Sequence, residues 1–132
     1  METREPISIL IVEDDNITAR SLEYTLKDVG YDVADVVSSG EEAIRRAASK
    51  RPDLVLMDIR LKGMIDGVSA AQRIQAQLDI PVVYLTGLSD PATFARIMHS
   101  SPYGYIIKPF VEEELYNAIE QALQRHKLKG RK

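Results

Sequence analysis

The stretch Asp53-Leu-Val-Leu-Met-Asp58 decides how the rest of this chain is interpreted. Four consecutive apolar residues between two acids are typical of a strand that is buried on both faces. The strand ends in Asp58, and burying an ionised carboxylate is unfavourable unless a metal, a cation or hydrogen-bond donors compensate it. In open parallel α/β sheets, ligands bind beyond the carboxyl ends of the strands. Asp58 is therefore the first candidate for a reactive group.

Other segments of the chain alternate between strand and helix signals. Apolar segments predict strands at residues 7–12, 31–37, 81–86 and 104–108. Helical periodicity and helix-start residues predict helices at about 16–29, 41–49, 68–77, 91–99 and 111–125. The run 59–67 has no clear period and is predicted to be a loop. Crossovers of this length impose parallel pairing, so the predicted fold class is α/β, a three-layer doubly wound sandwich around a five-stranded parallel sheet.

Several polar and aromatic residues have structural interpretations within these elements. Asp15 or Asn16 is predicted to cap the first helix, and Gly30 to end it. The Asp residues of segment 31–37 favour the edge of the sheet. Both histidines, His99 and His126, are predicted to be isolated surface residues. Three aromatic residues are predicted to have packing roles: Tyr84, Tyr103 and Phe94.

Composition excludes several classes of protein. The 132 residues suit a single domain spanning 1–132, with a core at about 6–126 and a basic tail at 127–132. The absence of cysteine excludes disulfides, thiolate catalysis and Cys-ligated metals. A net charge of -3 argues against a direct nucleic-acid partner. No apolar run is long enough for a membrane span, and residues 1–6 are unlike a signal peptide, so we expect a cytoplasmic protein without a membrane partner.

Polar residues stand at the ends of four predicted strands. They are Glu13 and Asp14, Asp58, Thr86, and Lys108. Neighbouring strands lie about 4.8 Å apart, so these side chains are expected to share one pocket. Three carboxylates this close repel one another, and a divalent ion relieves the repulsion. Oxygen ligands without His or Cys favour Mg²⁺ over Zn²⁺.

The same pocket suits the chemistry of a phosphoryl group. During transfer, negative charge spreads over three phosphoryl oxygens, which the metal, the Lys108 ammonium and the Thr86 hydroxyl are able to share. Asp58 is then a candidate carboxylate nucleophile that forms an acyl phosphate. No second nucleophile and no histidine accompany it, so a stable modification is as plausible as turnover.

Five motifs at these strand ends are specific to one family. They are Ile11-Val-Glu-Asp-Asp15, Met57-Asp-Ile-Arg-Leu61, Asp66-Gly67, Leu85-Thr-Gly87 and Gly104-Tyr-Ile-Ile-Lys-Pro-Phe110. Together they resemble the receiver domain of two-component response regulators, of the chemotaxis-regulator type, over essentially the whole chain. The resemblance implies a flavodoxin-like (βα)5 fold with strand order 2-1-3-4-5, an order that also places the acidic second strand at an edge.

The resemblance also assigns roles to individual residues. It implies that Asp58 is the phosphoacceptor and that Lys108 pairs with the phosphoryl group. Direct Mg²⁺ ligands would be Asp14, Asp58 and the backbone carbonyl of Arg60, with Glu13 acting largely through water. The resemblance further implies that Thr86 and Tyr105 form a switch pair. It also implies a cis peptide bond between Lys108 and Pro109.

The implied function is signalling rather than enzymatic turnover. A receiver domain accepts a phosphoryl group from a phosphohistidine on a sensor histidine kinase or a histidine phosphotransfer protein. Phosphorylation then alters the surface of the fourth helix, the last strand and the last helix, which is also the surface for a homodimer. Self-phosphotransfer and autodephosphorylation would be slow at most.

The chain departs from the common receiver pattern next to the phosphoacceptor. Lys62 stands where many receivers have proline, and the spacing from Asp58 to Gly67 is one residue longer than usual. Arg60 and Leu88 are predicted to flank the pocket mouth and to hinder an attacking water, which predicts slow self-dephosphorylation. The Pro102-Tyr-Gly-Tyr105 sequence resembles receivers that are fused to sensor kinases or work with them.

Two other functions remain as alternatives. A pseudo-receiver would bind partners without phosphorylation, although the full set of site residues argues against it. An Mg²⁺-dependent phosphatase with an Asp nucleophile usually has a second Asp two residues later, where this chain has Arg60. A flavin-binding protein would need a hydroxyl-rich loop after the first strand, and this chain lacks one.

Overall fold

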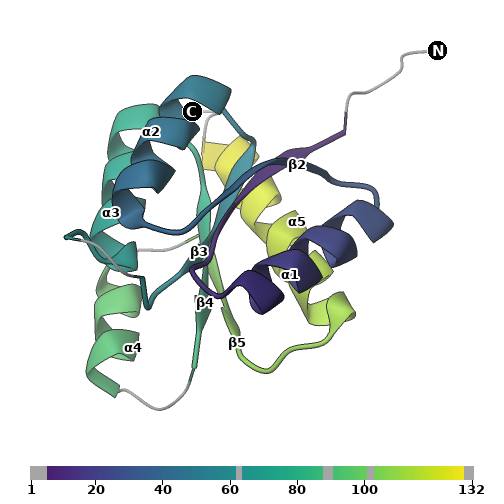
Figure 1. The fold of residues 1–132 in the computed structure, drawn as a ribbon. Coiled ribbons are helices and arrows are strands. Elements are labelled where there is room, and N and C mark those ends of the chain that lie inside the picture. Colours follow the sequence, from purple (N-terminus) through teal and green to yellow (C-terminus); the bar gives the residue numbers. More distant parts are fainter. Residues whose placement is uncertain (1–5, 62–63, 88–90, 101–102, 130–132) are drawn as a thin grey trace.

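Five parallel strands form one central sheet, in the order β2-β1-β3-β4-β5 (Figure 1). The computed structural model describes residues 6–61, 64–87, 91–100 and 103–129. The predicted strand order and parallel pairing are confirmed, with the acidic strand β2 at one edge. The strands are β1 (Ser8–Val12), β2 (Asp32–Val37), β3 (Leu54–Asp58), β4 (Val82–Thr86) and β5 (Gly104–Ile107).

Helices cover both faces of the sheet and complete the three layers. Helices α1 and α5 lie on one face, and α2, α3 and α4 lie on the other (Figure 1). Within the described residues, no helix is both long enough and apolar enough to cross a membrane. The helices are α1 (Asn16–Asp28), α2 (Gly40–Lys50), α3 (Gly67–Arg73) with the π-helical turn η1 (Ile74–Leu78), α4 (Pro91–His99) and α5 (Glu112–Lys129).

The sheet divides the core into two clusters, one on each face. Because side chains alternate along a strand, Val55 and Met57 of β3 face one cluster, whereas Leu54 and Leu56 face the other. All four are completely buried, as a central strand covered by helices on both faces requires. The strand identified first in the sequence is therefore the middle of the fold.

Helix boundaries follow the capping residues. The Asp15 side chain accepts a hydrogen bond from the Thr18 backbone N–H at 3.0 Å, which selects Asp15 over Asn16 as the cap of α1. Gly30 adopts φ 102° after the end of α1, a left-handed conformation that favours glycine. Ser39 caps α2 in the same way as Asp15 caps α1, by accepting from the N–H of Glu42.

Two helix predictions need correction. The segment predicted as a single helix at 68–77 begins at Gly67 and changes after Arg73 into a π-helical turn, which ends at Asp79 in a left-handed conformation. Helix α5 continues to Lys129 rather than ending at 125, so the expected basic tail begins inside it. No glycine or proline interrupts residues 110–129, so helix propensity allows the extension.

His126 lies near the surface, as predicted, but the expectation that it is isolated is wrong. Its Nε2 atom lies 2.8 Å from the backbone carbonyl oxygen of Asp79, and its ring packs edge-on against Tyr103 with centroids 5.5 Å apart. His126 therefore ties the last turns of α5 to the turn that ends η1. This contact joins residues distant in sequence, which explains why the local pattern did not predict it.

Candidate functional site

A solvent-accessible cavity lies at the carboxyl ends of β1, β3, β4 and β5, where the sequence predicted a shared pocket. Its volume is 390 Å³. The predicted site residues Glu13, Asp14, Asp58, Thr86 and Lys108 all line it, together with Arg60. The parallel topology accounts for this convergence, because every strand delivers its last residue to the same edge of the sheet.

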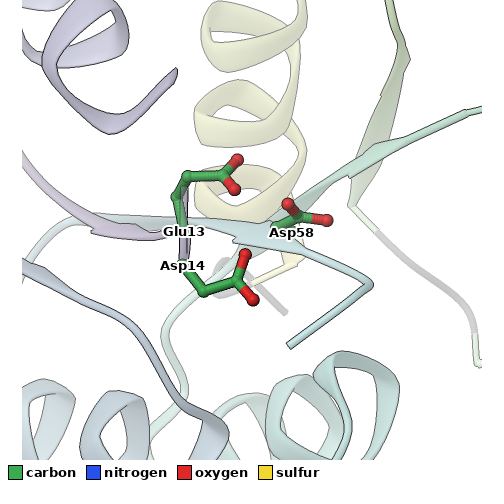
Figure 2. A group of neighbouring side chains, drawn as sticks. All are labelled: Glu13, Asp14 and Asp58. Carbon is green, nitrogen blue, oxygen red and sulfur yellow. The ribbon is translucent and has the colours of Figure 1, made fainter. Parts of the chain in front are cut away.

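Three carboxylates that line the cavity lie close together (Figure 2). Glu13 and Asp14 extend from the end of β1, and Asp58 from the end of the adjacent β3. One carboxylate oxygen of each lies within 4.8 Å of those of the others. Glu13 and Asp58 are only 3% and 6% exposed, so water screens their charges poorly. The site therefore concentrates negative charge in a partly desolvated place.

Lys108 supplies the positive charge that faces this cluster. Its Nζ atom lies 3.2 Å from Oδ2 of Asp58 and 3.5 Å from Oε1 of Glu13. Partial burial lowers the pKa of Lys108, but the charges of Asp58 and Glu13 outweigh burial and raise it. Lys108 therefore stays protonated at physiological pH and compensates part of the carboxylate charge.

The single ammonium group of Lys108 does not neutralise all three carboxylates. The pKa of Glu13 reflects the remaining negative charge. Burial, together with hydrogen bonding to Asp58 and the charge of Asp58, raises the pKa of Glu13 from 4.5 to about 7. The Asp15 backbone N–H, 3.2 Å from Oε2, opposes this rise. Near neutral pH Glu13 is therefore only partly ionised, and a second positive charge beside it would favour its ionised form.

The donor set fits a hard divalent cation. Carboxylate oxygens are the ligands that Mg²⁺ prefers, and Glu13, Asp14 and Asp58 offer three within 4.8 Å of one another. The elevated pKa of Glu13 points the same way, because it reflects surplus negative charge that a divalent ion would balance. The cavity also leaves room for waters and for an exogenous oxygen ligand.

Asp58 is oriented by its surroundings on both carboxylate oxygens. While Oδ2 pairs with Lys108, Oδ1 accepts a hydrogen bond from the Arg60 backbone N–H at 3.0 Å. Across the cavity, the buried Thr86 hydroxyl donates to the Gly87 carbonyl oxygen at 3.1 Å. The Lys108 backbone N–H donates to the Thr86 carbonyl oxygen at 2.7 Å, which holds the ends of β4 and β5 together.

Tyr105 lies apart from the other predicted site residues. It belongs to β5 at the sheet edge, is 37% exposed and does not line the main cavity. Its ring packs edge-on against Phe94 of α4, with centroids 5.5 Å apart. The peptide bond between Lys108 and Pro109 is cis, as the family resemblance implied.

The loop after β3 is held by contacts that the sequence did not reveal. Gly67 lies against the strand end so closely that a Cβ atom there would stand 2.5 Å from the Asp58 carbonyl oxygen, which excludes larger residues. Glu41 of α2 accepts a hydrogen bond from the Met64 backbone N–H at 2.9 Å. Lys62, the departure from the common pattern, and Leu88, predicted at the pocket mouth, lie outside the described residues.

Sequence reasoning missed two hydroxyl residues in the wall of the cavity. Thr18 lies in the first turn of α1 and donates to Oδ2 of Asp15, and Thr93 lies in the first turn of α4. Both helices begin at the edge where the strands end. Polar residues in the first turn after each strand were therefore the signal that would have found them.

Comparison with known proteins agrees with this architecture. A family model described as the response regulator receiver domain matches residues 9–120. The signal receiver domain of a modulated diguanylate cyclase from Desulfovibrio desulfuricans is 40% identical, with a TM-score of 0.89, covering 95% of this chain and 99% of that one. The signal receiver domain of a histidine kinase from Syntrophus aciditrophicus is 34% identical, with a TM-score of 0.80, covering 89% and 90%.

Curated relatives are longer proteins. The transcriptional regulatory protein PdtaR of Mycobacterium tuberculosis is 33% identical over 91% of this chain and 58% of its own length. The DNA-binding response regulator MtrA of Mycobacterium leprae is 35% identical over 89% of this chain and 52% of its own length. This chain thus spans little more than half the length of these relatives. The family match, the fold and the acidic cavity lead to one conclusion: the chain belongs to the response regulator receiver domains of two-component signalling.

Proposed function

We propose that this receiver domain accepts a phosphoryl group on Asp58, from a phosphohistidine of a sensor histidine kinase or a histidine phosphotransfer protein. The observation that carries the proposal is the placement of Asp58. Its carboxylate lies in an accessible cavity, 3.2 Å from the Lys108 ammonium and beside two further carboxylates. Ionised carboxylates in this partly buried place need positive charge nearby. A divalent metal ion that binds together with the phosphoryl donor would supply that charge.

The transfer step is a displacement at phosphorus. A carboxylate oxygen of Asp58 forms a P–O bond while the P–N bond to the donor histidine breaks, and the electron pair of that bond stays on the imidazole nitrogen. Mg²⁺, held by Asp14, Asp58 and the Arg60 carbonyl with Glu13 largely through water, would neutralise charge on the phosphoryl oxygens. Lys108 moves from its carboxylate partners toward a phosphoryl oxygen, and the Thr86 hydroxyl turns from Gly87 to a second one.

The same proposal accounts for the switch. When the Thr86 hydroxyl turns toward the phosphoryl group, the space beside it is open to Tyr105, which rotates inward from its exposed position against Phe94. The surface of α4, β5 and α5 then changes and binds a partner or a second copy of the chain. This signalling role needs no catalytic turnover.

A mass measurement tests the proposal. Incubation with acetyl phosphate and Mg²⁺ is expected to add one phosphoryl group to the intact protein, and peptide mapping is expected to place it on Asp58. Asp58→Asn is expected to abolish the modification. Asp53→Asn is the matched control, because Asp53 flanks the opposite end of β3, where its side chain accepts from the Ser8 N–H at 2.8 Å.

Three outcomes separate this proposal from its alternatives. Chelation of Mg²⁺ with EDTA is expected to prevent the modification. A wild-type protein that stays unmodified would support the pseudo-receiver alternative, a module that binds partners without phosphorylation. Rapid multiple turnover of small phosphoesters would support the phosphatase alternative, although Arg60 occupies the place of its usual second acid.

A further inference from the structure

Helix α4 buries few of its residues against the rest of the molecule. It lies beside α3 on one face of the sheet (Figure 1). Of its nine residues, only Ile97 is buried, whereas the seven-residue α3 buries four. One apolar anchor permits movement of a helix much more readily than a continuous buried face does. The polar contacts of α4 therefore contribute more to its position than such contacts usually do.

An ion pair joins α4 to the loop after the phosphoacceptor strand. Nη1 of Arg96, in the second turn of α4, lies 2.9 Å from Oδ2 of Asp66. The other carboxylate oxygen of Asp66 accepts the Ser69 backbone N–H at 2.8 Å and so caps α3. Burial raises the pKa of Asp66, but the hydrogen bonds from Arg96 and Ser69 outweigh it and lower the pKa, as expected for a carboxylate held by donors.

Each partner of this ion pair is one short step from the phosphoacceptor site. Asp66 precedes Gly67, whose backbone is packed directly against the Asp58 carbonyl. Arg96 follows Thr93 by three residues, and Thr93 lines the cavity that contains Asp58. The pair thus connects a loop fixed to the phosphoacceptor strand with the helix whose first turn forms another wall of the same cavity.

We propose that the Asp66–Arg96 ion pair is a latch that holds α4 in its unphosphorylated position and opposes the switch. The inference rests on the proposed function, since it assumes that phosphorylation of Asp58 moves α4. In the present conformation Tyr105 is exposed against Phe94, and the Thr86 hydroxyl binds Gly87 rather than a ligand. The latch is closed in this conformation, and a contact made in only one of two states shifts the equilibrium toward that state.

The exposure of the latch sets the size of the effect. The side chains of Arg96 and Asp66 are 51% and 43% exposed, so solvent screens the attraction. Exposed ion pairs of this kind change an equilibrium by a factor of about 1.5 to 5, and less at high salt. Phosphorylation easily overcomes such a restraint, so the latch adjusts the threshold of the switch and does not block it.

Beryllofluoride with Mg²⁺, a mimic of the Asp58 phosphoryl group, provides the test. Its affinity is measured by NMR titration for the wild type, Arg96→Met, Arg96→Lys and Asp66→Asn. Asn still caps α3, and Lys keeps the positive charge. We expect about 1.5- to 5-fold tighter binding for Arg96→Met and Asp66→Asn, little further gain in the double variant, and partial return to wild-type affinity for Arg96→Lys. Added salt is expected to reduce the differences.

Arg46→Met is the matched control. It removes an ion pair of similar exposure, Arg46 with Asp35 at 2.6 Å, which joins α2 to the edge strand β2 away from the cavity. It is expected to leave beryllofluoride affinity unchanged. Equal affinity of Arg96→Met and Arg46→Met, or weaker binding by Arg96→Met, would overturn the latch. Failure of the wild type to bind beryllofluoride would instead overturn the proposed function.

Discussion

Strand β3 and helix α4 border the same cavity, yet they are packed in opposite ways. Every residue of β3 is buried, including Asp58, whereas α4 buries only Ile97. A fully packed strand holds a reacting group in place, because its neighbours leave no room for other arrangements. A helix with one buried anchor changes position at little cost. Under the proposed function, the strand (the rigid wall) would bind the phosphoryl group and the helix (the loose wall) would respond to it.

The largest expected difference between the two walls is in how strongly their backbone amides are protected from hydrogen exchange. The Leu56 amide of β3 is expected to exchange only through global unfolding, and the Ile97 amide of α4 through local opening. We expect their opening free energies to differ by at least about 3 kcal/mol, or more than about 100-fold in protection. Native-state exchange followed by NMR measures both amides in one sample. Equal protection factors would remove the basis of the comparison.

The raised pKa of Glu13 predicts that the free energy of unfolding depends on pH. Because native Glu13 holds its proton up to a pKa of about 7, instead of 4.5 when unfolded, the native state binds more protons between these values. Stability therefore falls as pH rises through this window, by up to about 3 kcal/mol in the metal-free protein.

Glu13→Gln tests this dependence. The variant is expected to be more stable than the wild type at pH 8 and to show no gain below pH 4.5, as measured by urea unfolding without metal. Mg²⁺ is expected to stabilise the wild type at pH 8 more than the variant. A gain that is the same at both pH values would show that charge repulsion at Glu13 is not its cause.

Lys108→Met removes the cation that faces the carboxylates of Asp58 and Glu13. Loss of a charge-assisted hydrogen bond to a phosphoryl oxygen is expected to slow phosphorylation by acetyl phosphate about 10- to 100-fold. The rate is followed by intact-protein mass. Lys27→Met serves as a control, because it breaks the exposed pair with Glu23 on α1. A rate equal to that of this control would mean that Lys108 has no part in the transfer.

Arg60→Ala is expected to have the smallest effect, on the lifetime of the phosphorylated state. Arg60 is exposed at the cavity wall, and we expect its long side chain to hinder a water that approaches in line with the acyl phosphate bond. The variant is expected to lose its phosphoryl group several-fold faster once acetyl phosphate is removed. An unchanged decay rate would assign the barrier to another residue at the mouth.

The strand ends of the rigid wall and the helix of the loose wall were both predictable from sequence, but the contacts of that helix were not. Apolar strands with polar ends are local patterns, and parallel topology then brings Glu13, Asp58 and Lys108 to one edge whatever the loops do. The Asp66–Arg96 pair depends on how α4 is placed against α3, which no local pattern encodes. The π-helical turn at Ile74–Leu78 likewise reflects tertiary packing, since its sequence favours an ordinary helix.

One NMR experiment tests the central claim, that the rigid wall binds the phosphoryl group and the loose wall responds. Backbone amide shifts are compared before and after addition of beryllofluoride and Mg²⁺. We expect changes at Asp58 and its neighbours from direct contact, together with changes across α4 and β5, and unaltered shifts in the buried amides of Leu10 and Leu54. Saturation at Asp58 with α4 and β5 unchanged, or no binding by the wild type, would contradict it.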